Sequence, residues 1–452
     1  MTGRQASRSN SLSTTRPVAV VLAGSVALAL AGCAALGNEP EDTGPDTDLT
    51  LWLVGTDTTP DLREYLVQTF EDEHPGATLT IEQQEWGDLV DTLTEALADP
   101  ATTPDVVEIG NTQSPTFTTS GAFREISPEL YEELGGDDLL PSFVEAGSVD
   151  GRHYALPYYF GSRYVFYRKD VWREAGLEKP STLAEFGEAV KSLTDDVHAG
   201  LAMGGQDWRN GISWVFATGG ELAVKEGDRW VSTLADPKTV EGLEMWQDVY
   251  ENASYLPSTE KDVSYWDFLN DGVEDAPPAA ATIMAPAWAR WSIGDLERND
   301  EGEEVRDGMK DSSTFDIFPL PGVDGGLAPV FAGGSNIAVS ATSPSPELAE
   351  DVLRVVFSDE FQSRLAESGL GPADADAQEL MKGDKFGRTL VRTAAASKLT
   401  PAAPGWASIE DAGVYEDLFG RIAGGGDVAT LAQEFDARLT PMLNAPPADP
   451  EE

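Results

Sequence analysis

Leu49-Thr-Leu-Trp-Leu-Val54 is the first stretch of the chain with the apolar spacing of a β-strand. Residues 61–73 follow with apolar side chains on one helical face, which predicts an α-helix. Residues 77–81 predict a second strand, residues 88–97 a second helix and residues 105–109 a third strand. Strands and helices that alternate with short connections are typical of a parallel α/β sheet.

The second half of the chain also predicts strands and helices. Residues 161–167 predict a strand, and Thr182-Leu-Ala-Glu185 is a capping box that opens a helix. Asp236-Pro237 supplies a cap and an N1 proline for another helix. Long helices are expected over residues 346–367 and 427–443.

The N-terminus has the build of an export signal. Arg4, Arg8 and Arg16 form a positive region, and an apolar run extends over residues 18–30. Leu30-Ala-Gly-Cys33 resembles the bacterial lipobox, in which the cysteine thiol is lipidated and begins the mature chain. The alternative is an N-terminal transmembrane anchor, because the apolar stretch continues past the cysteine. We therefore predict a signal peptide over residues 1–32 and lipidation of Cys33.

The bulk composition excludes several classes of site. Residues 33–47 are rich in Pro, Gly and acidic residues and predict a flexible linker. The rest of the 452-residue chain is too long for one ordinary core, so two lobes are expected. Because Cys33 is the only cysteine and there are three histidines, neither a disulfide framework nor a zinc site is expected. No cofactor motif is present, and we expect no cofactor and no metal.

The charge is strongly acidic. The chain has 79 acidic and 30 basic residues and a formal net charge of -49. Such a surface repels nucleic acid and anionic substrates at long range, so no nucleic-acid partner is expected. The charge also suits solubility in a saline exterior, where salt screens carboxylates from one another.

Several passages stand out in the order Phe70-Glu-Asp-Glu-His-Pro-Gly76, Gln84-Glu-Trp-Gly-Asp88, Pro104-Asp-Val-Val-Glu-Ile-Gly-Asn-Thr-Gln113, Gly151-Arg-His-Tyr-Ala-Leu-Pro-Tyr-Tyr159, Tyr167-Arg-Lys-Asp-Val171, Phe331-Ala-Gly-Gly-Ser-Asn-Ile-Ala338, Pro404-Gly-Trp406 and Gly425-Gly-Asp-Val428. In this order they resemble the extracellular solute-binding proteins of carbohydrate ABC transporters, in particular the maltose- and chito-oligosaccharide-binding members of family 1.

The resemblance implies an α/β fold of the two-lobed, periplasmic-binding-protein-like type II, with discontinuous lobes joined by a hinge. Lobe I is expected over residues 48–158 and 335–385, and lobe II over residues 159–334 and 386–447. The implied function is capture of a mono- or oligosaccharide by lobe closure and its delivery to a membrane permease. The implied protein is not an enzyme, is monomeric, and is held at the extracellular face of the cell membrane by its lipid.

A saccharide offers a flat apolar face and a rim of hydroxyls, so its receptor needs aromatic faces and polar side chains. In open α/β sheets such groups gather where strands end. From these arguments and the resemblance, the candidate ligand-binding residues are Asp57, Glu85, Trp86, Asn111, Gln113, Tyr158, Tyr159, Trp208, Trp288, Arg290, Gly334, Ser335, Asn336 and Trp406.

Structural roles remain open for several candidates. Asn111 could cap a helix, Asp57 could serve a turn, and Arg290 could form an ordinary surface ion pair. Of Tyr158 and Tyr159, one is expected to face the sugar and the other to face away. Two functional alternatives also stay open: a lipid-anchored secreted glycoside hydrolase, and a polyamine- or peptide-binding protein of the same fold.

Overall fold

The computed structural model describes residues 47–261, 264–270, 279–294, 296–298, 304–306, 308–309 and 314–446. The predicted signal peptide, the predicted lipidation site Cys33 and the predicted linker up to residue 46 lie outside the described residues. Over the part of the chain that is described, no helix has the length and apolar character needed to cross a membrane.

The predicted strands near the N-terminus are confirmed and form one edge of an 8-stranded sheet. Strand β1 (Asp48–Val54) lies between β2 (Thr78–Gln84) and β3 (Val106–Gly110), and both neighbours are parallel to it. Strand β13 (Ala332–Val339) then pairs antiparallel with β3. The strands β1, β2 and β3, which helices connect, are therefore parallel to one another, whereas β13 joins the sheet antiparallel.

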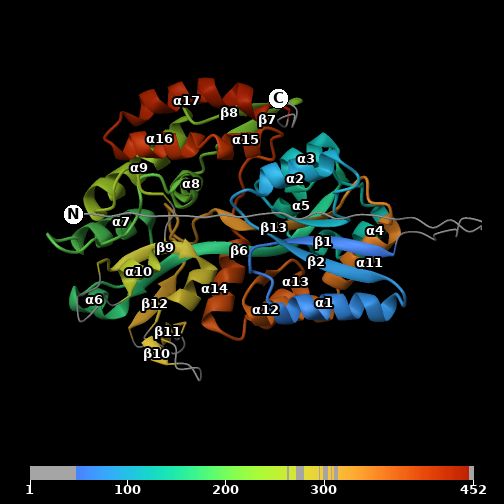
Figure 1. The fold of residues 1–452 in the computed structure, drawn as a ribbon. Helices are drawn as coiled ribbons and strands as arrows, with labels where there is room; N and C mark the ends of the chain where they lie inside the picture. Colours follow the sequence, from blue (N-terminus) through green and yellow to red (C-terminus); the bar gives the residue numbers. More distant parts are fainter. Residues whose placement is uncertain are drawn as a thin grey trace, which may run out of the picture. The chain divides into compact units, whose positions relative to one another are not determined.

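The longest strand, β6 (Ala155–Arg168), connects two parts of the sheet. Its first half pairs with β13 and with β14 (Gly371–Pro372), and its second half pairs with β9 (Thr282–Pro286) and β12 (Phe315–Phe318). Figure 1 shows β6 running from the β1–β3 region to the β9–β12 region. It includes the strand predicted at residues 161–167.

Two hydrophobic clusters, one on each face of strands β1 to β3, together make up the first core. Helices α1 (Pro60–Glu73), α11 (Pro346–Val356) and α12 (Asp359–Ser368) cover one face, and α2 (Leu89–Ala98) and α3 (Ser114–Ser120) cover the other (Figure 1). Leu51 and Leu66 are fully buried on the first face, and Leu93 on the second.

A second core is built mainly of helices. It contains α7 (Leu183–Ser192), α8 (Trp208–Ala217), α9 (Pro237–Ala253), α15 (Trp406–Asp411) and α17 (Val428–Leu443). The predicted helix starts are confirmed: Thr182 Oγ1 accepts a hydrogen bond from the Glu185 amide at 3.2 Å, and Pro237 begins α9. A third cluster lies around the middle of β6.

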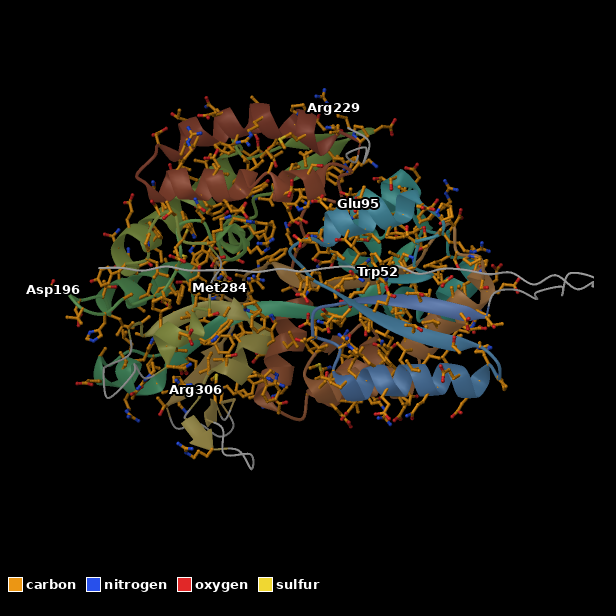
Figure 2. All side chains as sticks on the ribbon, viewed as in Figure 1. Trp52, Glu95, Asp196, Arg229, Met284 and Arg306 are labelled. Atoms are coloured by element: carbon orange, nitrogen blue, oxygen red, sulfur yellow. The ribbon has the colours of Figure 1, made fainter. Side chains whose placement is uncertain are left out.

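The remaining elements complete the chain. They are α4 (Pro128–Glu133), η1 (Gly136–Asp138), α5 (Pro141–Ala146), β4 (Ser148–Val149), β5 (Arg152–His153), α6 (Lys169–Glu174), β7 (Ala223–Glu226), β8 (Arg229–Ser232), α10 (Trp266–Leu269), η2 (Ala287–Ser292), β10 (Leu296–Arg298), β11 (Glu304–Arg306), α13 (Ala375–Met381), α14 (Lys385–Ala394) and α16 (Val414–Ala423). Figure 2 shows the labelled Asp196 and Arg229 at the outside of this framework, whereas the buried Met284 lies within it.

The prediction of one continuous helix over residues 346–367 is wrong. The structure has two helices, α11 and α12, separated by Phe357 and Ser358. The Ser358 hydroxyl accepts a hydrogen bond from the Phe361 amide at 3.3 Å and so caps a new helix. The predicted lobe boundaries fall inside β6 and β13 and at the start of α14, and they stay a prediction.

Candidate functional site

Trp86 lies over the carboxyl ends of β1 and β3. A Cβ added at Gly55 would lie 2.9 Å from Trp86 Nε1, and one added at Gly110 would lie 3.3 Å from its Cζ3. The two glycines thus leave the room in which the indole packs. Because Trp86 is still 38% exposed, its ring offers surface to a ligand.

The carboxylate of Asp57 lies beside this indole. Its Oδ2 accepts a hydrogen bond from the Tyr159 hydroxyl at 3.0 Å and would lie 3.8 Å from a Cβ at Gly55. The Tyr158 hydroxyl instead pairs with Thr58 Oγ1 at 2.8 Å in the interior. Tyr159 is therefore the tyrosine of this pair that contacts a predicted ligand residue, and both rings are buried. Glu85 is exposed next to Trp86.

A buried carboxyl group that the sequence analysis did not single out lies beneath these residues. Glu108 is fully buried on β3; its Oε2 accepts from the Val54 amide at 2.9 Å and its Oε1 from the Ser335 hydroxyl at 2.7 Å. Burial raises the pKa of Glu108 to about 7, against the lowering effect of these hydrogen bonds.

The other polar candidates near β3 use their side chains within the protein. Asn111 Nδ2 donates to the Ala332 carbonyl at 3.2 Å, and the Asn111 amide donates to the Gly334 carbonyl at 3.0 Å. Asn336 Nδ2 donates to the Phe143 carbonyl at 2.9 Å. Gly334 has a φ of 144°, and a Cβ there would lie 2.4 Å from the Tyr159 carbonyl oxygen. The hydrogen bonds fasten β13 to the end of β3 and to α5, and the absence of a side chain at Gly334 lets β13 lie close to β6.

Trp208 and Trp406 pack together in the second core. Their ring centroids are 6.3 Å apart at 63°, and each ring also contacts Tyr415. Both side chains are almost fully buried, and the Arg209 guanidinium lies 4.6 Å from the Trp208 ring centre. Neither indole therefore presents an open face, and their role in ligand binding stays a prediction.

Glu410 is a second carboxyl group that the sequence analysis missed. It lies one helical turn after Trp406 on α15. Burial raises the pKa of Glu410, whereas its interactions with Arg209, Trp406 and Thr112 act to lower this pKa. Its Oε2 accepts from the Thr112 hydroxyl at 3.0 Å, and its Oε1 lies 3.9 Å from Arg209 Nη2. Glu410 follows Trp406 by four residues, so the two side chains share one face of the helix, and this spacing is the sequence signal that could have identified Glu410.

Thr112 and Thr116 connect the two cores at this point. Besides the Thr112–Glu410 hydrogen bond, the Ala407 amide donates to Thr116 Oγ1 at 3.3 Å. In the described part of the chain, the buried polar atoms that lack hydrogen-bond geometry to a partner include several from these segments: Gln113 Oε1, Ser114 Oγ, Trp208 Nε1, Trp406 Nε1, Glu410 Oε1 and Glu416 Oε2. They comprise donors and acceptors, as a hydroxyl-rich ligand requires.

Trp288 and Arg290 occupy a different neighbourhood, on η2. Trp288 is 46% exposed and meets the Trp266 ring edge-on at 5.1 Å. The Arg290 guanidinium lies 4.2 Å from the ring centre of Trp291 and 5.4 Å from that of Phe386. The described contacts therefore do not bring Arg290 to the β1–β3 loops.

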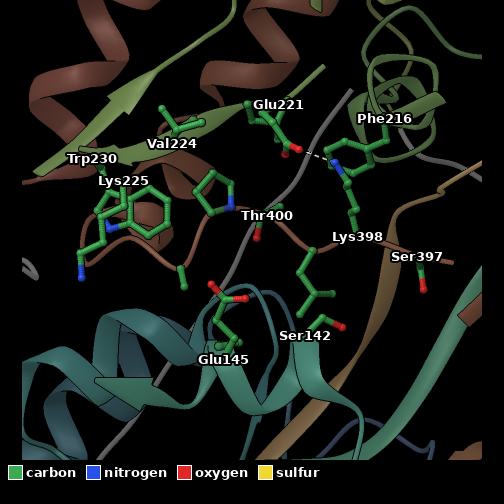
Figure 3. A pocket seen from close by; sticks show the side chains of 16 residues that line it. Ser142, Glu145, Phe216, Glu221, Val224, Lys225, Trp230, Ser397, Lys398 and Thr400 are labelled. Carbon is green, nitrogen blue, oxygen red and sulfur yellow. Dashed lines mark hydrogen bonds and ion pairs between the residues drawn. The ribbon is translucent and has the colours of Figure 1, made fainter. Parts of the chain in front are cut away.

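A groove of about 430 Å³ is lined by residues of α5 and of the β7–β8 hairpin. Figure 3 shows it from close by. An ion pair between Lys398 and Glu221 lies on its wall, with Trp230 and Glu145 nearby. None of the candidate ligand residues lines this groove. Among the described residues, no group of histidine, cysteine and carboxylate side chains is arranged to hold a metal ion.

Comparison with known proteins gives the family. The sequence model described as "Bacterial extracellular solute-binding protein" matches residues 55–363. The chain is 30% identical to the diacetylchitobiose binding protein DasA of Streptomyces coelicolor, over 84% of this chain and 87% of that protein. It is 23% identical to an arabinooligosaccharide-binding protein of Halalkalibacterium halodurans, over 69% and 68% of the two chains.

Solved structures show the same fold. The sugar-binding protein MalE of Xanthomonas citri superposes with a TM-score of 0.73 at 20% identity, covering 88% of this chain and 97% of the other. The GacH receptor of Streptomyces glaucescens, solved without ligand and with acarbose, gives a TM-score of 0.69 at 19% identity, covering 88% and 98%. The predicted two-lobed α/β fold is thereby confirmed.

Proposed function

Because the chain belongs to the bacterial extracellular solute-binding proteins, we propose that it captures a mono- or oligosaccharide and delivers it to an ABC importer. The observation that carries this proposal is the exposed Trp86 ring beside the Asp57 carboxylate at the ends of β1 and β3. An aromatic face next to a fixed hydrogen-bond acceptor suits a sugar, which has an apolar face and a rim of hydroxyls. The sugar-binding names of the relatives support the same ligand class.

The second half of the proposed site is the polar surface at Arg209 and Glu410, with the buried Trp208 and Trp406 rings packed beneath it. Trp86 and Asp57 lie near the ends of β1 and β3, next to the first core, whereas Trp208 and Trp406 belong to the second core. A sugar that contacts both cores binds the closed form more tightly than the open form and so shifts the population toward closure. The Thr112–Glu410 hydrogen bond is the kind of contact that such a closed form would gain.

Strands β6 and β13 are the proposed hinge. Both strands run between the two cores, and β13 pairs with the first half of β6, over residues 155–162, with a register shift between Ser335 and Asn336. Small changes in their backbone angles can rotate one core against the other while the side chains within each core stay packed.

Four further properties are proposed with the function. The lipobox-like Leu30-Ala-Gly-Cys33 supports a lipid anchor at Cys33 on the extracellular face of the membrane. The protein is proposed to act as a monomer and without catalysis, and its partners are the permease subunits. The glycoside hydrolase and the polyamine- or peptide-binding alternatives are not favoured by the comparisons.

A thermal-shift screen of the purified protein tests the ligand class. The compounds are chito-, malto- and arabino-oligosaccharides, their monosaccharides, and putrescine. A sugar at 100 times its Kd should add about 2.7 kcal/mol to the free energy of unfolding, which is a clear rise in Tm. A shift with putrescine and none with any sugar would replace the carbohydrate proposal with the polyamine alternative.

A further inference from the structure

A second cavity, of about 440 Å³, is lined by residues of η2, of β12 and of the start of α14. Figure 1 labels β12 and α14. The lining includes apolar surface from Trp291 and Phe386 and the charged groups of Lys169, Arg290 and Lys385. Of the candidate ligand-binding residues, only Arg290 lines this cavity. An apolar wall with a few converging polar groups is the usual form of a small-molecule site.

Arg290 is held in place by aromatic rings. Its guanidinium lies 4.2 Å from the ring centre of Trp291 and 5.4 Å from that of Phe386. A Cβ at Gly369, whose φ is 92°, would lie 2.5 Å from Arg290 Nη2, so the glycine leaves room for the guanidinium. Among the described residues, no carboxylate forms an ion pair with Arg290 and no oxygen accepts a hydrogen bond from it. Its five N–H donors therefore remain for an acceptor from outside the protein.

The two carboxylates of the cavity are already engaged within the protein. Asp316 lies between two lysines, because its Oδ2 is 3.2 Å from Lys179 Nζ and its Oδ1 pairs with Lys385. Asp384 caps α14 and accepts hydrogen bonds from two backbone amides at the start of that helix, at 2.5 and 3.1 Å. Neither carboxylate is left to neutralise Arg290.

Positive charge is therefore in excess here. Four cations lie at the cavity: Lys169, Lys179, Arg290 and Lys385. They face two carboxylates, although the whole chain has 30 basic and 79 acidic residues. Burial and the charges of Lys179 and Lys169 lower the pKa of Lys385 to about 8, as expected where cations repel one another. An anion that enters the cavity would relieve this repulsion.

We propose that this cavity binds a small organic anion, whose carboxylate or phosphate group bonds to Arg290 and whose apolar part lies against Trp291 and Phe386. A planar guanidinium matches two oxygens of such a group and can donate to both at once. Lys169 and Lys385 supply further positive charge on the cavity wall. This site is separate from sugar capture, because neither Trp86 nor Asp57 lines the cavity.

Calorimetry with three ligands of similar shape tests the anion site on the wild-type protein. Benzoate carries a carboxylate, phenyl phosphate carries a phosphate, and benzamide is the neutral counterpart of benzoate. Benzoate, phenyl phosphate or both should bind at one site per chain, and benzamide should bind about tenfold more weakly or less. Raising the salt concentration from about 50 to about 300 mM should weaken the binding of the anions.

Arginine variants locate the binding. Arg290→Gln removes the charge but keeps a polar side chain, and should weaken anion binding about tenfold or more. Arg364→Gln is the matched control: the Arg364 guanidinium also lies over an aromatic ring, that of Tyr65 at 4.4 Å, but it pairs with Glu360 at 2.8 Å. This control should bind the anions as the wild type does. Lys385→Gln, at an exposed position, should weaken anion binding several-fold.

Two results would overturn the anion site. One is equal affinity of the wild type for the anions and for benzamide, or no binding of either anion. The other is an Arg290→Gln variant that keeps the Tm of the wild type and binds the anions as tightly. Saccharide titrations of the same protein judge the proposed function separately, since a sugar at the Trp86 surface does not occupy this cavity.

Discussion

Trp86 and Trp406 were both expected to stack on the ligand, but their burial predicts opposite effects of substitution. Trp86 is 38% exposed, whereas Trp406 is 0% exposed and packs against Trp208 and Tyr415. Trp86→Ala should therefore weaken sugar binding with a small loss of stability. Trp406→Ala should first of all destabilise the fold.

The magnitudes follow from the exposed fraction. A tryptophan can bury up to roughly 250 Å², so an exposed fraction of 38% leaves about 95 Å² for a sugar to cover. At about 25 cal/mol per Å² this contact contributes about 2 kcal/mol, or about a 30-fold change in Kd. Removing the buried Trp406 ring should lower the free energy of unfolding by about 3–5 kcal/mol.

Calorimetry gives Kd and urea denaturation gives the free energy of unfolding for each variant. Trp230→Ala is a matched control, because Trp230 lines the groove in Figure 3 and not the proposed sugar site. Its Kd should equal that of the wild type. A normal Kd in Trp86→Ala, or a normal stability in Trp406→Ala, would refute the assignment of these two rings.

Further consequences can be checked separately. Glu108→Gln should have a free energy of unfolding up to about 3 kcal/mol higher than that of the wild type at pH 8.5, and a similar one at pH 4. The reason is that the stability contributed by a carboxyl group with a raised pKa is fully present below its ordinary pKa of 4.5 and is lost as the pH rises through about 7. Urea titrations at both pH values measure the difference. Thr112→Val, which loses the hydrogen bond to Glu410, should weaken sugar binding by about 1–2 kcal/mol, and a calorimetric Kd equal to that of wild type would contradict the closure contact. Small-angle scattering should show a smaller radius of gyration on sugar loading, and an unchanged radius with an open empty form would indicate a static module. Cys33→Ala should block acylation and leave an uncleaved or shed protein, which mass spectrometry detects, and a wild-type protein that partitions into the aqueous phase without acyl groups would contradict the lipid anchor.

Local patterns predicted much of the first core. The apolar spacing of residues 49–54 and 61–73 is a short-range property, and the structure has β1 and α1 there. The break between α11 and α12 was missed because the apolar period continues across Phe357, and the capping role of Ser358 depends on a turn that periodicity does not report.

The site was harder to predict than the fold. Glu108 and Glu410 are two of 79 acidic residues, so their identity alone carries no signal, and their burial depends on contacts with distant residues such as Ser335 and Thr112. Trp406 follows a turn sequence that suggested exposure, but packing from Trp208 and Tyr415 buries it. Long-range packing, which a single sequence does not display, decides these cases.

Calorimetric titration of the purified protein with chito-, malto- and arabino-oligosaccharides, followed by chromatography of each mixture, tests the receptor assignment most directly. We predict saturable binding of at least one saccharide at one site per chain, with the sugar recovered unchanged. The absence of binding by every saccharide, or the appearance of hydrolysis products, would contradict it.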